Sequence, residues 1–145
     1  MQVKDVMTRE VEVAHPSNTI QEAAAKMDRL DVGPLPVCDG KRVIGVITDR
    51  DITVRATAVG QAPTETRVGD VMSRDVLFCY ADQDVGEAAQ LMQAKQVRRL
   101  VVLDRNEELV GIISLGDLAV DGGSDRLSGA TLEAVSEPSR PDREP

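Results

Sequence analysis

A hydroxyl residue followed three positions later by an aspartate ends an apolar run twice in this sequence. The pairs are Thr48 with Asp51 and Ser114 with Asp117. Ser or Thr at the end of a strand caps a following helix, because its oxygen accepts a backbone N–H, and Asp is favoured in the first helical turn. Free N–H groups, a hydroxyl and a carboxylate gathered at one junction suit a ribose and a phosphate, although the same pattern also serves as a plain helix cap.

The two junctions belong to an internal repeat. Residues 3–39 and 68–104 align at an offset of 65, and 14 of the 37 aligned positions carry the same residue. One extra residue then enters the second copy, and at an offset of 66 Asp51 recurs as Asp117. A two-copy repeat of this length indicates two supersecondary units that bury their apolar faces on each other.

Each copy predicts the same order of elements, β-α-β-β-α. In the first copy, the capping box of Thr19 and Glu22 opens a helix, and Asp39-Gly40 marks a hairpin turn. The apolar stripe of that helix is Ile20, Ala23, Ala24, Met27 and Leu30. The first copy is expected to contain strands over residues 11–14, 35–38 and 43–48 and a second helix over about 49–58. The second copy is expected to contain strands over 76–80, 100–103 and 109–114 and a last helix from Leu115.

The composition limits the classes of function. The net charge is −8, which argues against general nucleic-acid binding and against an anionic membrane surface. No apolar run approaches 18 residues, so we expect no membrane span and a cytoplasmic location. With one Phe, one Tyr and no Trp, the core must be aliphatic. The expected organisation is repeat 1 over 1–60, a linker over 61–67, repeat 2 over 68–120 and a polar, mobile tail over 121–145.

The two cysteines do not form a disulfide framework or a paired metal motif. Cys38 and Cys79 fit small apolar strand residues, and a zinc site with His15 would have the right residue types without a characteristic spacing. We therefore expect no metal. The sequence also contains no nucleophile–base pair and no P-loop, so we expect no catalytic residues and no enzyme.

Three motifs recur in register, and together they resemble a tandem cystathionine β-synthase (CBS) domain pair over about residues 1–120. Asp-Val-Met followed by Thr8 or Ser73 opens each copy, residues 33–37 and 98–102 match the middle strand of the family, and residues 45–51 and 111–117 match its closing turn. The resemblance implies an α/β (α+β) fold in which two repeats related by a pseudo-twofold axis form one CBS-pair, or Bateman, module. The chain is similar to the small stand-alone bacterial proteins of this family.

The resemblance also implies a regulatory sensor, without a prosthetic group, that binds an adenine nucleotide or a related adenosyl ligand in two clefts between the repeats. One cleft would be lined by Thr8, Val11, Val32, Gly33, Pro34, Arg98, Arg99, Ser114, Gly116 and Asp117. The other would be lined by Ser73, Val76, Val97, Gly33, Pro34, Thr48, Arg50 and Asp51. The aspartates would accept hydrogen bonds from the ribose, apolar strand residues would enclose the adenine, and the arginines would meet phosphate.

Two other functions stay open at this point, a ligand-free dimerisation module and a redox- or zinc-linked stress-response protein. Each repeat has two amphipathic helices for a three-stranded sheet, so apolar helix surface should remain exposed and a homodimer is expected. The identity of the adenosyl ligand (AMP, ADP, ATP or S-adenosylmethionine), the number of filled clefts, the dimer orientation and the protein target also stay open.

Overall fold

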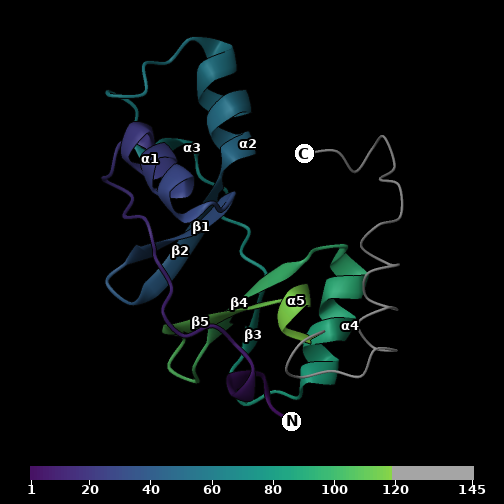
Figure 1. The fold of residues 1–145 in the computed structure, drawn as a ribbon. Coiled ribbons are helices and arrows are strands. Elements are labelled where there is room, and N and C mark those ends of the chain that lie inside the picture. Colours follow the sequence, from purple (N-terminus) through teal and green to yellow (C-terminus); the bar gives the residue numbers. More distant parts are fainter. Residues whose placement is uncertain (119–145) are drawn as a thin grey trace. The chain divides into compact units, whose positions relative to one another are not determined.

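The computed structural model describes residues 1–118, which fold into two compact units (Figure 1). Unit 1 contains residues 1–10, 78–105 and 110–118, and unit 2 contains residues 11–77 and 106–109. The opening segment of the first repeat therefore lies with the body of the second repeat, and the opening of the second lies with the body of the first. The two repeats exchange their opening segments. The predicted tail over residues 121–145 lies outside the described residues.

The sheet of unit 2 is an antiparallel hairpin of β1 (Pro34–Asp39) and β2 (Arg42–Thr48). The turn contains Gly40, whose φ of 66° is accessible at low cost because glycine has no Cβ. The hairpin that Asp39-Gly40 predicted is therefore confirmed.

Helix α1 (Ile20–Leu30) contacts β1 of this hairpin. The predicted capping box is present, since the Glu22 N–H donates to Thr19 Oγ1 at 3.2 Å and the Thr19 N–H donates to Glu22 Oε1 at 3.3 Å. Ala23 is buried, but the prediction that Ala24 also faces the core is wrong, because Ala24 is exposed. Helix α1 packs on a sheet of only two strands. The equivalent Ala89 of unit 1 packs in a unit with three strands and is fully buried.

The strand predicted over residues 11–14 is reduced to a single bridge between Ala14 and Val37. The Ala14 N–H donates to Pro36 O at 2.8 Å, and the Cys38 N–H donates to Ala14 O at 2.9 Å. Extending this parallel ladder toward residue 12 would require an N–H on Pro36, which proline lacks. Val101 takes the place of Pro36 in the second repeat and has an N–H, so a strand forms there, although it spans only Phe78–Tyr80 of the predicted residues 76–80.

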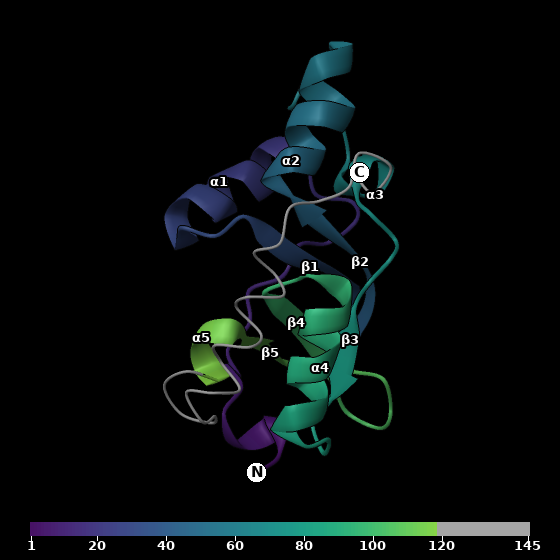
Figure 2. The ribbon, with the colours of Figure 1, turned by 90° about the vertical axis from the view of Figure 1, so that its right-hand side faces the viewer.

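The chain after β2 is helical from α2 (Asp49–Asp51) through a π-helical turn (Ile52–Ala56) and a 3-10 turn (Thr57–Val59). This segment matches the extent of the predicted second helix, and Figure 2 shows it as one coil. It ends at Gly60, whose φ is 79°. The short helix α3 (Val68–Val71) follows and starts the opening of the second repeat.

Unit 1 has a three-stranded sheet in the order β3-β4-β5. The strand β3 (Phe78–Tyr80) runs parallel to β4 (Arg99–Leu103), which is followed by β5 (Leu109–Ser114). Helix α4 (Val85–Lys95) contacts β4, and α5 (Leu115–Asp117) begins directly after β5. Residues Val3–Asp5 form a 3-10 turn.

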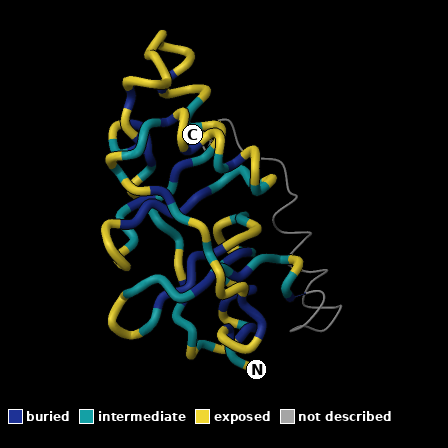
Figure 3. The backbone as a smooth tube through the Cα atoms, turned by 60° about the vertical axis from the view of Figure 1, so that its left-hand side comes forward, coloured by how far each residue is buried: buried dark blue, intermediate teal, exposed yellow. Residues whose placement is uncertain are grey.

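Both opening segments contribute to a core (Figure 3). The core of unit 2 includes residues from the opening of the second repeat, which are Val68, Val71 and Met72. The opening of the first repeat likewise buries Val3, Val6 and Met7. The exchange of openings is therefore part of the packing of each unit. No helix within residues 1–118 has the length and apolar character needed to cross a membrane.

Candidate functional site

Each opening segment pairs with the strand that leads to a Ser/Thr-x-x-Asp turn. In unit 1 the Thr8 N–H donates to Ile112 O at 2.8 Å and the Ile112 N–H donates to Thr8 O at 2.9 Å. In unit 2 Ser73 and Val46 exchange the equivalent bonds, at 2.9 and 2.8 Å. Directly opposite residues of an antiparallel pair point to the same face. The Thr8 side chain is therefore on the same face of β5 as Ile112 and Ser114.

This face is half-buried and apolar in both units. On β2 and β5 the alternate residues on this face are intermediate in burial, whereas the residues between them are buried. The half-buried set is Ile44, Val46 and Thr48 in unit 2 and Val110, Ile112 and Ser114 in unit 1. A partly exposed aliphatic strip that ends in a hydroxyl can pack against a flat heteroaromatic ring and leave polar groups at the ring's edge.

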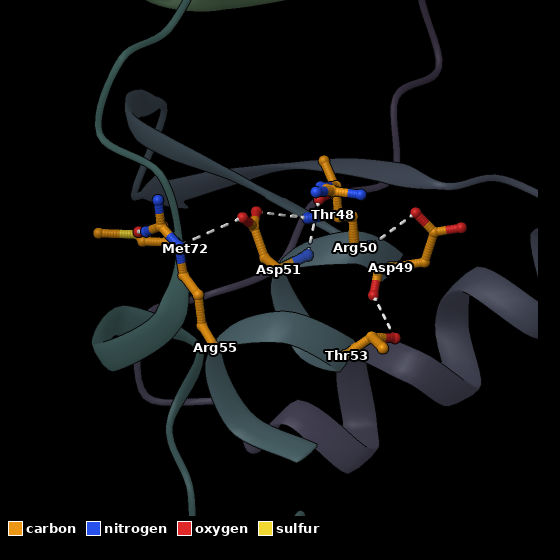
Figure 4. Close-up of polar contacts among 7 residues, drawn as sticks. All are labelled: Thr48, Asp49, Arg50, Asp51, Thr53, Arg55 and Met72. Carbon is orange, nitrogen blue, oxygen red and sulfur yellow. Dashed lines mark hydrogen bonds and ion pairs between the residues drawn. The ribbon is translucent and has the colours of Figure 1, made fainter. Parts of the chain in front are cut away.

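The predicted cap is present at both turns. In unit 2 the Asp51 N–H donates to Thr48 Oγ1 at 3.0 Å, and Asp51 Oδ2 accepts from the Thr48 N–H at 3.0 Å (Figure 4). In unit 1 the Asp117 N–H donates to Ser114 Oγ at 3.2 Å, and Asp117 Oδ2 accepts from the Ser114 N–H at 2.8 Å. The cap uses Oδ2 of each aspartate. The second oxygen, Oδ1, is outside the cap and can accept a hydrogen bond from a ligand hydroxyl.

Arg55 is a residue of this site that the sequence reasoning missed. Its Nε lies 3.7 Å from Asp51 Oδ1, and its Nη1 donates to Met72 O at 3.3 Å (Figure 4). The Asp51 side chain is 14% exposed, so Arg55 partly neutralises a largely buried carboxylate. The available signal was the i, i+4 spacing of Asp51 and Arg55 on a predicted helix. Arg55 also ties the turn to the opening of the second repeat.

In each unit a backbone hydrogen bond joins the start of the middle strand to the Ser/Thr-x-x-Asp turn. The Asp49 N–H donates to Gly33 O at 3.1 Å, and Pro34 pairs with Thr48 in the ladder of β1 and β2. In unit 1 the Leu115 N–H donates to Arg98 O at 2.9 Å. The second repeat therefore brings the backbone of an arginine next to its Ser/Thr-x-x-Asp turn, where the first repeat brings Gly33.

The predicted cleft residues divide between the two units. Unit 1 holds Thr8, Val97, Arg98, Arg99, Ser114, Gly116 and Asp117. Unit 2 holds Val11, Val32, Gly33, Pro34, Thr48, Arg50, Asp51, Ser73 and Val76. Within each unit the structure brings one opening hydroxyl, one turn and one middle-strand start together. Some predicted lining residues lie in the unit that does not hold the turn of their cleft: Val11, Val32, Gly33 and Pro34 for the cleft of Asp117, and Val97 for the cleft of Asp51.

The two cysteines are buried in different units. Cys38 and Cys79 are each 3% exposed, and burial raises the pKa of Cys38 and raises that of Cys79 to about 11. Thiols with raised pKa values are protonated at neutral pH and are poor nucleophiles and ligands. His15 is exposed, with Nδ1 2.7 Å from Ser17 Oγ. No cluster of three or more His, Cys, Asp or Glu suited to a metal ion occurs within residues 1–118.

Comparison with known proteins agrees with the repeat and the two turns. The family model of the CBS domain matches residues 3–56 and 68–120. The chain belongs to the CBS domain family. The CBS domain-containing protein YhcV of Bacillus subtilis is 42% identical to it over 134 residues, which cover 92% of this chain and 94% of that protein.

Solved CBS structures share the fold. The crystal structure of Hypoxic Response Protein I with two coordinated zinc ions has a TM-score of 0.75 and 31% identity, and covers 83% of this chain and 98% of that one. The CBS domain pair of MJ0100, in complex with 5-methylthioadenosine and S-adenosyl-L-methionine, has a TM-score of 0.68 and 28% identity, with coverages of 82% and 97%. CBSX2 in complex with AMP has a TM-score of 0.69 and 27% identity, with coverages of 81% and 92%.

Proposed function

We propose that this protein is a non-enzymatic sensor that binds an adenosine-containing ligand beside each Ser/Thr-x-x-Asp turn. The observation that carries the proposal is the recurrence of one arrangement in two units, in which a half-buried aliphatic strand face meets a hydroxyl and an aspartate with one oxygen outside the cap. Similar proteins crystallised with AMP or with methylthioadenosine and S-adenosylmethionine support this ligand class.

The parts of the ligand match the parts of the site. The aliphatic face of β2 or β5 packs against the adenine, and Oδ1 of Asp51 or Asp117 accepts hydrogen bonds from the ribose hydroxyls. A hydrogen bond to a charged group contributes about 1.5–3 kcal/mol. We also propose that the opening hydroxyls, Thr8 and Ser73, border the ligand. Val11, Val32, Val76 and Val97 remain predicted apolar lining of the two sites.

The site of unit 1 is proposed to take the phosphorylated ligands AMP, ADP or ATP. Arg98 and Arg99 begin the middle strand there, next to the turn of Asp117, and guanidinium groups bind phosphate in a bidentate manner. The first repeat has Gly33 and Pro34 at the same places, and neither supplies a cation. Arg50 is the cation within the turn of unit 2, where unit 1 has Gly116.

The proposed output of the sensor is a changed contact with a protein target, in a homodimer. Exposed apolar residues on the helical segment that follows β2 support the dimer, since Val54 is 46% and Val59 66% exposed. Such side chains on a helix are often covered by a second copy. Ala24, which is exposed on α1, adds to the uncovered apolar helix surface.

Calorimetric titration of the full chain tests the proposal. The panel is adenosine, AMP, ATP, methylthioadenosine and S-adenosylmethionine, with GMP as a control that has the same ribose and phosphate but another base. We expect saturable heat for at least one adenosine compound and none for GMP. No binding of any adenosine compound at millimolar concentration would overturn the proposal. A dimer without ligand would then indicate a structural dimerisation module.

A further inference from the structure

The Asp49 carboxylate occupies the place beside Gly33 in unit 2. Both of its oxygens lie 3.4 Å from the point where a Cβ on Gly33 would stand. Asp49 is exposed, and its Oδ1 accepts a hydrogen bond from the Arg50 N–H at 2.9 Å. In Figure 4 it points away from the Asp51 carboxylate. The site of unit 2 therefore has a negative charge beside the start of its middle strand.

The second repeat has a cation where the first has no side chain, and an apolar residue where the first has a carboxylate. Arg98 corresponds to Gly33 at the offset of 65, and Leu115 corresponds to Asp49 at the offset of 66. An equivalent backbone hydrogen bond joins each pair. The Asp49 N–H donates to Gly33 O at 3.1 Å in unit 2, and the Leu115 N–H donates to Arg98 O at 2.9 Å in unit 1. At equivalent backbone positions one repeat thus has a carboxylate beside a residue without a side chain, and the other has an arginine beside an apolar residue.

Neither of the two arginines near this turn, Arg50 and Arg55, forms an ion pair with the Asp49 carboxylate. Arg55 is engaged by Asp51 and by the carbonyl of Met72. Arg50 gives its N–H to Asp49, and its side chain is exposed to solvent. A phosphate next to Gly33 would meet a carboxylate at close range, and Pro34 has no N–H to donate to it.

We propose that Asp49 is a specificity-determining residue that excludes phosphate from the site of unit 2. That site then takes adenosyl ligands that are neutral or positively charged beyond the ribose, such as adenosine, methylthioadenosine or S-adenosylmethionine, while the site of unit 1 takes the phosphorylated ligands. The inference rests on the proposed function, because it concerns which adenosyl compound fills which site.

Three substitutions test this role in the full chain. Asp49→Asn keeps an acceptor for the Arg50 N–H and removes the charge, Asp49→Leu introduces the residue found in the second repeat, and Leu115→Asp makes the reverse change in unit 1. Each is titrated with adenosine, AMP and S-adenosylmethionine. Each is also combined with Asp51→Asn or Asp117→Asn, which weaken one site and so identify the other. The measured quantity is the ratio of the AMP Kd to the adenosine Kd at each site.

Both Asp49 variants should strengthen AMP binding in unit 2 by about tenfold and leave adenosine nearly unchanged, as expected for removing one charge near a phosphate. Leu115→Asp should weaken AMP in unit 1 by a similar factor. Added salt should reduce both differences. If adenosine binds and the ratio does not change, or if both ligands change equally, Asp49 is only a structural cap and the inference is wrong. If none of adenosine, AMP and S-adenosylmethionine binds the wild-type protein, the proposed function fails, and the inference with it.

Discussion

Gly111 lies directly against the side chain of Met7, more than a hundred positions earlier in the chain. A Cβ on Gly111 would stand 2.6 Å from Met7 Sδ and 2.7 Å from Thr8 O. Gly45 has the same relation to Met72, whose Sδ lies 2.8 Å from the equivalent point. Both glycines are therefore required where the opening of the other repeat crosses the strand.

Replacing either glycine with alanine should destabilise the protein. Gly45→Ala and Gly111→Ala each force a methyl group into an occupied space, and overpacking of this kind costs about 1–3 kcal/mol. Urea unfolding measures the loss. Gly116→Ala is the matched control, because its nearest contact would be Ser114 Oγ at 3.6 Å, and it should be neutral or slightly stabilising. An unchanged urea midpoint for Gly111→Ala would contradict the close crossing.

Replacing the turn aspartates should weaken ligand binding one site at a time. Asp51→Asn and Asp117→Asn keep an oxygen for the cap and remove the charge that receives the ribose. We expect at least a tenfold loss of affinity at the altered site, since a hydrogen bond to a charged group is worth about 1.5–3 kcal/mol. Asp39→Asn in the exposed hairpin turn is the control in calorimetry. If both variants bind ligand with the affinity of the wild-type protein, the ribose assignment is wrong.

Removing Arg98 or Arg99 should weaken the binding of phosphorylated ligands and leave adenosine binding nearly unchanged. Arg98→Ala and Arg99→Ala are each expected to cost on the order of 1–3 kcal/mol in AMP or ATP affinity, less at high salt. Arg105→Ala is a control, because Arg105 pairs with Asp82 at 2.7 Å and stacks on Tyr80 in the same unit. Equal losses for adenosine and AMP would indicate that the arginines hold the fold, and no loss for either would make them solvated surface charges.

The buried cysteines should react with thiol reagents only in the unfolded protein at pH 8. Because burial raises the pKa of Cys79 from 9.0 to about 11, its thiol contributes stability below pH 9 that is lost as the pH rises toward 11. The urea midpoint should therefore fall over this range. Cys79→Ala should remove that part of the pH dependence, with Cys38→Ala as the comparison. Fast labelling of native protein at pH 8 would contradict the burial of both thiols.

The exposed valines of the helical segment should matter for association. Light scattering at tens of micromolar is expected to give the mass of a dimer. Val54→Asp or Val59→Asp should shift the mass toward a monomer, because a charge cannot be buried without a partner. Phe78→Asp, at an exposed apolar residue of unit 1, is the control. A monomer mass for the wild-type protein would count against the dimer.

Local features of the fold could be predicted from the sequence, and contacts between distant segments could not. The cap of Thr19 and Glu22 and the turn at Gly40 depend on neighbouring residues, and both are present. The reduced first strand follows from the missing N–H of Pro36, a local signal that the β-rich pattern concealed. The exchange of openings depends on tertiary pairings between Thr8 and Ile112 (112 − 8 = 104 positions apart) and between Val46 and Ser73 (73 − 46 = 27 positions apart), for which the sequence has no local signal. Which of the site residues touch a ligand stays a prediction.

The pairing of Thr8 with Ile112 also bears on how the chain folds during its synthesis. The two residues are 104 positions apart (112 − 8), and a ribosome adds about 5–20 residues per second. Residues 1–10 are therefore made roughly 5–20 s before their partner strand. Residues 11–77 of unit 2 have all been synthesised well before β5 is made. We expect the middle of the chain to close first and Met7 to stay open to solvent until β5 emerges. Protection of Met7 from oxidation in a nascent chain stalled near residue 100 would contradict this order.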